Sequence, residues 1–305
     1  MDIHLDNIKN KINKGKLNNF KVRLQYFLPK HLLTRLVGVF AGAKMGKFTT
    51  WCIKKFIDHY NVNTAEMEDD IESFETFNDF FARPLKNYTR PIDKDEHSVV
   101  FPSDGRVSQF GDLTENIQLQ AKGHYFTVDN LLGSEEYGNY FRNGKFATVY
   151  LSPRDYHRVH IPVDSILQKM IHIPGDLFSV NPLYVQNIPE LYAHNERVVC
   201  IFETPVGKMA VVLVGATIVR SISTVWCGTV APNKSNQVVE IDYQKTNVRF
   251  KRGEEIAKFT MGSTVICLFE KDKIDFAGDY GIESRVHYGN KMAIAKDYHK
   301  QENKL

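Results

Sequence analysis

The chain has 305 residues, of which 43% are hydrophobic and 25% are charged. This composition excludes a disordered or fibrous protein and allows one large domain or two ordinary ones. The four cysteines show no paired spacing, so the sequence indicates neither a zinc site nor a disulfide framework, and reduced thiols in a cytoplasmic compartment are expected. They are Cys52, Cys200, Cys227 and Cys267.

The net charge of +3 is unevenly distributed along the chain. Residues 1–62 contain 12 Lys and Arg against three Asp, so this segment carries +9 and the remainder of the chain carries −6. A basic segment attached to a mildly acidic body is expected to meet an anionic partner, either a nucleic acid or a lipid surface.

Residues 27–57 combine apolar residues with lysines at intervals, and their longest uncharged run, residues 36–43, is far too short for a transmembrane helix. The spacing predicts amphipathic helices, which either lie in a membrane interface or pack on the body of the protein. Interfacial contact is favoured because apolar and cationic residues share one stretch. The first apolar cluster comes late and has no small-residue cleavage site after it, so no secretory signal is expected.

The acidic stretch of residues 63–86 has phenylalanines near a 3.6-residue period, which predicts a helical linker over residues 63–98. From residue 99 onward, short apolar runs alternate with Gly, Pro, Asp and Asn, which predicts a mostly antiparallel β body over residues 99–305. Residues 204–208 lie between two apolar runs and predict a hairpin turn. The expected fold class is therefore α+β, with amphipathic helices in residues 1–62 preceding the β body.

Three features of the body could carry chemistry, although each has a simpler interpretation. His157 and His160 are three residues apart, so a strand would place them on opposite faces and a turn would bring them together. Asp104 precedes a glycine, as in an ordinary turn. Gly262 and Ser263 interrupt an apolar run, and a glycine inside a strand by itself favours a β-bulge.

An aspartate, a histidine and a serine are together the parts of an activated nucleophile. A chain of this length contains many such triples, however. No Walker loop, GxGxxG or HExxH sequence occurs, so nucleotide hydrolysis, dinucleotide binding and zincin chemistry lose their usual support, and no metal site is expected. The residues alone indicate a β-rich body preceded by a basic amphipathic region in residues 1–62. They leave serine chemistry open as one possible activity.

Eight ordered segments over about residues 70–270 resemble phosphatidylserine decarboxylases of the bacterial membrane-associated type. Each segment would be weak alone, and their common order makes the resemblance specific. The segments are FNDFFARPLKNYTRPID (77–93), FPSDGRV (101–107), AKGHYFTVDNLLG (121–133), LSPRDYHRVHIPVD (151–164), PGDLFSVNPLYV (174–185), NERVV (195–199), VLVGATIVRSISTVWCGT (212–229) and RGEEIAKFTMGSTVICLFE (252–270).

The resemblance implies that the chain cuts itself between Gly262 and Ser263, leaving residues 1–262 as a β chain and the 43 residues 263–305 as an α chain. Ser263 would attack the carbonyl of Gly262, where a side chain is expected to block the approach. His160 would take the hydroxyl proton, and Asp104 would orient and charge that histidine. Ser263 would become a pyruvoyl group, the covalent cofactor.

In this family the pyruvoyl group forms a Schiff base with the amine of phosphatidylserine and accepts the electrons left when CO₂ departs, which yields phosphatidylethanolamine. The resemblance makes His157 a candidate for positioning the substrate or donating the product's proton. Phe178 and Val180 are expected to line the pocket. Two alternatives are a catalytically silent membrane-binding relative and a serine hydrolase that uses Ser263.

A phospholipid substrate would explain why residues 1–62 are basic, since anionic lipid attracts Lys and Arg by about 1 kcal/mol each near the membrane surface. Lipid is therefore favoured over nucleic acid, with a peripheral location on the cytoplasmic side of the cell membrane. The resemblance also allows a homodimer.

Three positions depart from the family pattern. Met261 replaces the usual Leu, which is a volume-conserving change. Ser103 replaces the usual Ala, so its hydroxyl could perturb Asp104. Arg220 stands where a Gly is usual, and the local turn must differ if that glycine had a positive φ.

Overall fold

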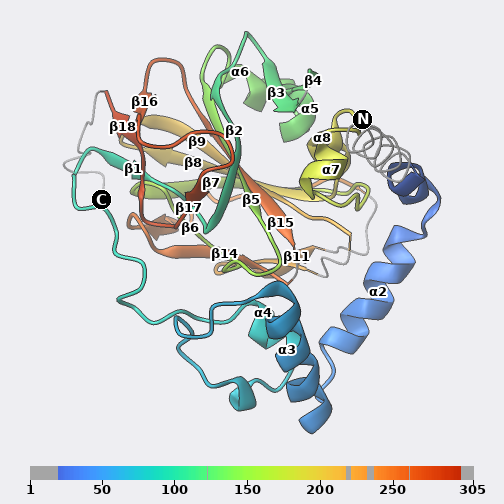
Figure 1. Ribbon diagram of the computed structural model, residues 1–305. Helices are drawn as coiled ribbons and strands as arrows, with labels where there is room; N and C mark the ends of the chain where they lie inside the picture. Colours follow the sequence, from blue (N-terminus) through green and yellow to red (C-terminus); the bar gives the residue numbers. More distant parts are fainter. Residues whose placement is uncertain (1–19, 122, 218–220, 232–236, 261, 297–305) are drawn as a thin grey trace, which may run out of the picture.

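The computed structural model describes residues 20–121, 123–217, 221–231, 237–260 and 262–296 (Figure 1). Its centre is a nine-stranded antiparallel sheet with the order β12-β7-β8-β9-β15-β5-β2-β17, in which β13 also pairs with β7. The strands are β2 (Gly105–Asp112), β5 (Lys145–Leu151), β7 (Ser165–Ile173), β8 (Arg197–Thr204), β9 (Gly207–Val214), β12 (Val239–Asp242), β13 (Arg249–Phe250), β15 (Ser263–Phe269) and β17 (Arg285–Val286).

The central strands β8, β9 and β15 are almost continuous apolar runs, because they are buried along nearly their whole length. The hairpin predicted at residues 204–208 is confirmed, since Thr204 of β8 pairs with Gly207 of β9. Four short helices contribute side chains to the same core, which completes an α+β body. They are α5 (Val128–Leu132), α6 (Glu135–Asn139), α7 (Pro182–Val185) and α8 (Leu191–His194).

Three smaller antiparallel sheets surround the central one. The first has the order β1-β18-β16, from Ser98–Val100, Lys291–Ala295 and Ile274–Phe276. The second has the order β11-β10-β14-β6, from Gly228–Ala231, Ile222–Thr224, Glu255–Phe259 and Arg158–His160. The third pairs β3 (Ile117–Ala121) with β4 (His124–Thr127).

The apolar run that contains Gly262 is two strands and not one. β14 ends at Phe259 in the four-stranded sheet, and β15 begins at Ser263 in the nine-stranded sheet. Gly262 therefore lies where the chain crosses between sheets, and a β-bulge within one strand is the wrong interpretation of this glycine.

The N-terminal region is helical over residues 20–27, in α2 (Lys30–Ala41) and in α3 (Lys47–Tyr60). Figure 1 shows α2 running along the outside of the molecule, apart from the sheets. α3 packs through Ile53 into a second, smaller core with residues of the following segment. None of the described helices is long and apolar enough to cross a membrane.

The helical pattern of residues 63–86 is only partly realised. It yields the 3-10 turn η1 (Ile71–Ser73) and the short helix α4 (Phe77–Phe81), which begins with a capping box between Thr76 and Asp79. The phenylalanines of this segment meet in the second core because the chain folds around α3, so their spacing does not reflect one long helix.

Candidate active site

Ser263 begins β15 and is completely buried. It pairs with Leu151 of β5, while the next residue, Thr264, also pairs with Val214 of β9. The Ser263 side chain is 0% exposed, and its Oγ has no hydrogen-bond partner in the described part of the chain. A buried hydroxyl without a partner costs about 1–3 kcal/mol, so the Ser263 hydroxyl is destabilising in this position and is available for a new contact.

Two glycines of the candidate site differ in the space around them. A side chain would not fit at Gly105, next to Asp104, but one would fit at Gly262. A Cβ on Gly105 would lie 2.4 Å from the carbonyl oxygen of Tyr150, because β2 and β5 approach closely there. No atom of the described residues lies within 4 Å of a Cβ built on Gly262. The expectation that a side chain at 262 would be blocked is therefore not met in this conformation.

His157 is fully buried and has one free ring nitrogen. Its Nδ1 lies 2.8 Å from the carbonyl oxygen of Asp155, so Nδ1 carries the proton and Nε2 carries the lone pair. Nε2 has no partner among the described residues. The ring packs on Phe81 at 4.2 Å, and burial lowers the pKa of His157 to about 4. His157 is therefore neutral at pH 7, with an unused acceptor.

His160 has both ring nitrogens engaged. Nδ1 donates to the carbonyl of Gly253 at 2.8 Å, and Nε2 accepts from the hydroxyl of Tyr156 at 3.1 Å. The ring of Tyr288 stacks on it at 3.8 Å. Burial lowers the pKa of His160, against the charges of Glu255 and Asp104, which favour the protonated form.

The two histidines have different surroundings, because His160 is the last residue of β6 and His157 directly precedes that strand. The backbone N–H of Phe259 donates to the carbonyl of His157 at 3.0 Å, and Glu255 lies opposite His160. Phe259 lies four residues beyond Glu255 along β14, so the backbone of His157 is paired nearer in the sequence to Gly262 than the backbone of His160 is.

Asp104 is buried and accepts several hydrogen bonds. Arg90 donates to it from Nε at 3.1 and 3.0 Å and from Nη2 at 2.6 Å, and Nδ1 of His287 lies 3.2 Å away. The backbone N–H of Tyr288 donates at 3.0 Å. Burial alone would raise the pKa of this carboxyl, but the hydrogen bonds from His287 and Arg90 outweigh burial and lower the pKa.

No hydrogen bond joins Asp104 to His160 among the described residues. Tyr288 connects them, since its N–H binds the carboxylate and its ring stacks on the imidazole. Sequence reasoning missed Arg90, His287, Tyr288 and Tyr156 as members of this cluster. Arg90 and Tyr156 lie in segments that carry the family resemblance, whereas nothing in the spacing of His287 and Tyr288 could have identified them.

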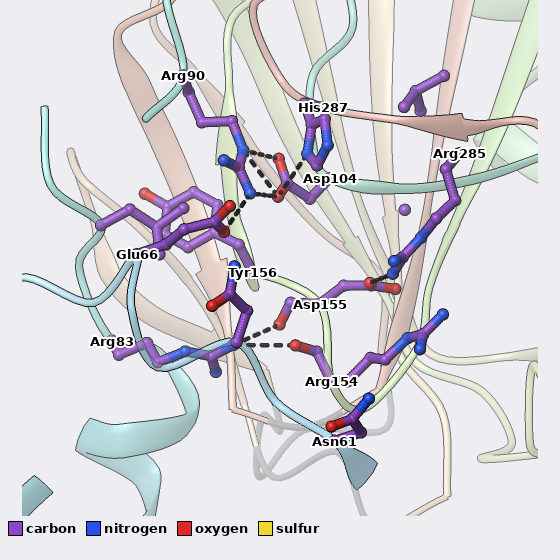
Figure 2. Close-up of a pocket in the computed structure, with 14 residues that line it drawn as sticks. Asn61, Glu66, Arg83, Arg90, Asp104, Arg154, Asp155, Tyr156, Arg285 and His287 are labelled. Carbon is purple, nitrogen blue, oxygen red and sulfur yellow. Dashed lines mark hydrogen bonds and ion pairs between the residues drawn. The ribbon is translucent and has the colours of Figure 1, made fainter. Parts of the chain in front are cut away.

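A cavity of about 350 Å³ opens beside Asp104 (Figure 2). Charged groups line it, including Arg83, whose Nη2 donates to the carbonyls of Arg154 and Asp155 at 3.0 and 3.3 Å. The side chain of Asp155 pairs with Arg285 at 2.7 Å. Neither His160 nor Ser263 lines this cavity, so it reaches Asp104 but not the Gly262–Ser263 bond.

Phe178 and Val180 are both buried in the loop between β7 and α7. Asn195 holds this loop: its Oδ1 accepts from the N–H of Phe178, and its Nδ2 donates to the carbonyls of Phe178 and Gly215. Gly215 directly follows Val214 of β9, and Val214 pairs with Thr264 of β15. Asn195 therefore connects the loop to β9, the neighbour of the strand that begins with Ser263.

Ser103 is buried, but its Oγ has no hydrogen-bond partner in the described residues, so it makes no such contact with Asp104. Met261 and Arg220 lie outside the described residues. All four cysteines are free thiols. No group of three or more His, Cys, Asp or Glu within the described ranges is arranged to hold a metal ion.

Comparison with known proteins assigns the family. A family model described as phosphatidylserine decarboxylase matches residues 77–294, and a second model, described as PSD, matches residues 20–61. A phosphatidylserine decarboxylase proenzyme of Vibrio parahaemolyticus is 52% identical over 265 residues, which cover 85% of this chain and 93% of that protein. Proteins of the same name from Pseudoalteromonas translucida and Vibrio cholerae are 47% and 50% identical, and the match covers 92% and 91% of this chain and 99% of each relative. The chain belongs to the phosphatidylserine decarboxylase family.

Proposed function

We propose that this chain is a decarboxylase of phosphatidylserine that matures by cutting itself between Gly262 and Ser263. The observation that carries the assignment is the Ser263 hydroxyl, which is fully buried and has no partner among the described residues, at the point where the chain crosses between two sheets. Relatives that match along most of the chain are named as proenzymes, which fits maturation by cleavage.

The cut is an acyl shift followed by an elimination. Ser263 Oγ gives its proton to a base and bonds to the Gly262 carbonyl carbon, while the carbon–nitrogen bond breaks and the nitrogen takes a proton. Loss of the Cα proton then expels the Gly262 carboxylate from the Ser263 side chain. Addition of water to the resulting dehydroalanine, in its imine form, releases ammonia and leaves a pyruvoyl group at position 263.

His160 is the base for the cut, with Asp104 as the residue that supports it. The negative charge of Asp104 favours protonated His160, and this is the form that exists once the hydroxyl proton has moved. Tyr288 holds the imidazole in line with Asp104 by stacking on one and donating to the other. His160 must exchange the Tyr156 hydroxyl for that of Ser263 when it acts.

The surroundings of position 263 fit a pyruvoyl group, because a buried position would strengthen the hydrogen bonds between that group and bound substrate, once the cut has opened the position to water and substrate. When formed, the group would supply the carbonyl that accepts the electrons of the departing CO₂. The free Nε2 of His157 is a hydrogen-bond acceptor suited to the serine ammonium of the substrate. Its low pKa means that it can donate a proton only after taking one from that ammonium.

The placement of His157 also supports a second candidate for the base. The backbone of His157 is paired nearer in the sequence to Gly262 and its ring has a free lone pair, whereas the Nε2 of His160 already accepts from Tyr156. His160→Ala and His157→Ala separate the two candidates. We expect His160→Ala to stay uncut, and His157→Ala to be cut but to release little CO₂ from phosphatidylserine vesicles. An uncut His157→Ala protein beside a normally cut His160→Ala protein would reverse the two roles.

The overall function is tested with Ser263→Ala and release of CO₂ from carboxyl-labelled phosphatidylserine. The wild type is expected to form two chains and phosphatidylethanolamine, and Ser263→Ala to stay as one chain without decarboxylation. Thr264→Ser, which changes the next residue but keeps a hydroxyl, serves as the control and should be cut. A single wild-type chain that hydrolyses esters, or one that only binds vesicles, would support the serine hydrolase or the silent relative instead.

The N-terminal helices are proposed to contact the surface of the membrane that contains the substrate, on its cytoplasmic side. Large apolar side chains of this region face outward, and Phe27 reaches 85% exposure. They are Phe20, Leu24, Tyr26, Phe27, Leu32, Leu36, Val39, Phe40, Phe48, Trp51 and Tyr60. Such a face beside many lysines is typical of helices that lie in a lipid interface. Binding to anionic but not to neutral vesicles is the expected result.

A further inference from the structure

The N-terminal helices contact the loop of residues 176–181, which contains Phe178 and Val180. Gln25, in the helical turns of residues 20–27, is buried, and its Oε1 accepts from the backbone N–H of Ser179 at 3.2 Å. The Thr217 hydroxyl lies 3.4 Å from the same oxygen. The Tyr26 ring meets the Phe178 ring edge-on at 5.2 Å.

Lys30 adds a buried cation to this contact. Its side chain is 7% exposed, and its Nζ lies 3.3 Å from Oδ1 of Asp176 and 3.8 Å from the centre of the Phe178 ring. Nζ also donates to the carbonyl of Gln25 at 3.1 Å. An ion pair, a cation–π contact and a charged hydrogen bond thus converge on one ammonium group.

The position of Lys30 is unfavourable for the helix itself. Lys30 is the first residue of α2, and the first turn of α2 has no acidic residue. A cation at a helix N-terminus opposes the helix dipole, and burial of an ammonium group adds a desolvation cost. The contacts with the loop are therefore what stabilises Lys30 in this place.

The loop gripped by these residues is connected to the scissile strand. Asn195, which is completely buried, binds both backbone groups of Phe178 and also the carbonyl of Gly215. Gly215 continues β9, whose Val214 pairs with Thr264. A continuous set of contacts thus leads from the outward-facing helices to the residue beside Ser263.

We propose that Gln25 and Lys30 are positioning residues for decarboxylation, which hold the Asp176–Asn181 loop in place at the substrate pocket. The proposal rests on the proposed function and on the expectation, taken from the family resemblance, that Phe178 and Val180 line the substrate pocket. The contacts of Gln25 and Lys30 order the loop before substrate binds. Substrate binding is then not weakened by the free-energy cost of ordering the loop. Loss of these contacts raises KM and leaves the intramolecular cut unaffected.

The test uses the full-length, processed protein and a short-chain phosphatidylserine kept below its micelle-forming concentration. This removes membrane binding from the measurement. For Lys30→Met and Gln25→Leu we expect a KM about tenfold higher, which corresponds to about 1.4 kcal/mol, with kcat changed less than about twofold. The extent of cutting should equal that of the wild type, and Lys30→Arg, which keeps the charge, should recover most of the KM.

Arg35→Met is the matched control, since it removes one positive charge from an exposed position of the same helix. It should leave KM for the monomeric substrate unchanged. The proposal is wrong if KM is unchanged in Lys30→Met and Gln25→Leu, or if Arg35→Met raises KM by the same factor. It is also wrong if Lys30→Met and Gln25→Leu are not cut. Failure of the proposed function would look different, because the wild type itself would then be uncut or inactive.

Discussion

Two groups of buried polar side chains differ in how completely they are hydrogen bonded. Around Asp104, both carboxylate oxygens accept hydrogen bonds from Arg90, and both ring nitrogens of nearby His160 are also paired. By contrast, two other buried atoms, Ser263 Oγ and His157 Nε2, have no hydrogen-bond partner among the described residues. The difference indicates that Asp104 and the resting His160 ring are held in place, whereas Ser263 Oγ and His157 Nε2 can each still form a hydrogen bond.

Arg90→Met is expected to have the largest effect on stability, because it leaves the buried Asp104 carboxylate without its main partner. Breaking such a buried pair costs about 3 kcal/mol of unfolding free energy at pH 7. Without Arg90, burial is opposed by fewer hydrogen bonds and the pKa of Asp104 should be higher than in the wild type, so the stability difference from wild type should shrink as the pH falls and the carboxyl becomes protonated. Urea denaturation of uncut protein on a Ser263→Ala background, repeated from pH 7 to pH 4, measures both effects.

Lys291→Met provides the comparison for a surface ion pair. Lys291 pairs with Asp95 at 2.9 Å, but both side chains are partly exposed. Its stability should stay close to that of the Ser263→Ala parent at every pH. An Arg90→Met protein as stable as Lys291→Met would show that the Asp104 group is not the rigid part of the site.

The pH dependence of His157 has a smaller expected effect with a defined direction. Its folded-state pKa of about 4 lies below the usual His value near 6.5, so the unfolded chain binds the proton more readily between these two pH values. Stability should therefore fall as the pH drops from 6.5 to 4, by up to about 3 kcal/mol from this group.

His157→Gln isolates that contribution, since a glutamine does not titrate. On the same uncut background, it should flatten the fall in stability between pH 6.5 and pH 4. Denaturation midpoints at half-unit pH intervals give the comparison. An unchanged slope would mean that His157 is accessible to solvent and protons in the folded state, contrary to its complete burial.

Gly262→Ala should have the smallest effect on stability. The described residues leave room for a methyl group at this position, so the unfolding free energy should change by less than about 0.5 kcal/mol. Gly105→Ala is the contrasting variant, since its Cβ would collide with the Tyr150 carbonyl, and it should be strongly destabilised. Equal effects of the two substitutions would contradict the described backbone positions.

The architecture could be predicted from the sequence where the signals were local. The 204–207 hairpin and the buried runs of β8 and β9 follow from turn residues and apolar content. The crossing at Gly262 could not be predicted, since a buried run has the same pattern whether its halves share a sheet or lie in two. The phenylalanine spacing of residues 63–86 predicted a helical linker that is only partly formed. The phenylalanines pack around α3 and do not lie along one helix.

The family resemblance supplied the candidate site residues, but it did not supply the residues that contact them. His287 and Tyr288 reach Asp104 because β17 pairs with β2, so Val286 meets Gly105 across 181 residues of sequence. No local spacing reports such a pairing. The free nitrogen of His157 likewise depends on the nearby Asp155 carbonyl, which fixes the tautomer.

The most direct test of the central claim is the intact mass of the purified wild-type protein. Conversion of Ser263 predicts two chains, with the 43-residue C-terminal fragment lighter than the unmodified sequence 263–305 by the mass of one ammonia. That fragment should resist N-terminal sequencing and react with a hydrazide at its ketone. A single uncut chain with full decarboxylase activity, or a fragment that begins with an ordinary serine, would contradict the account.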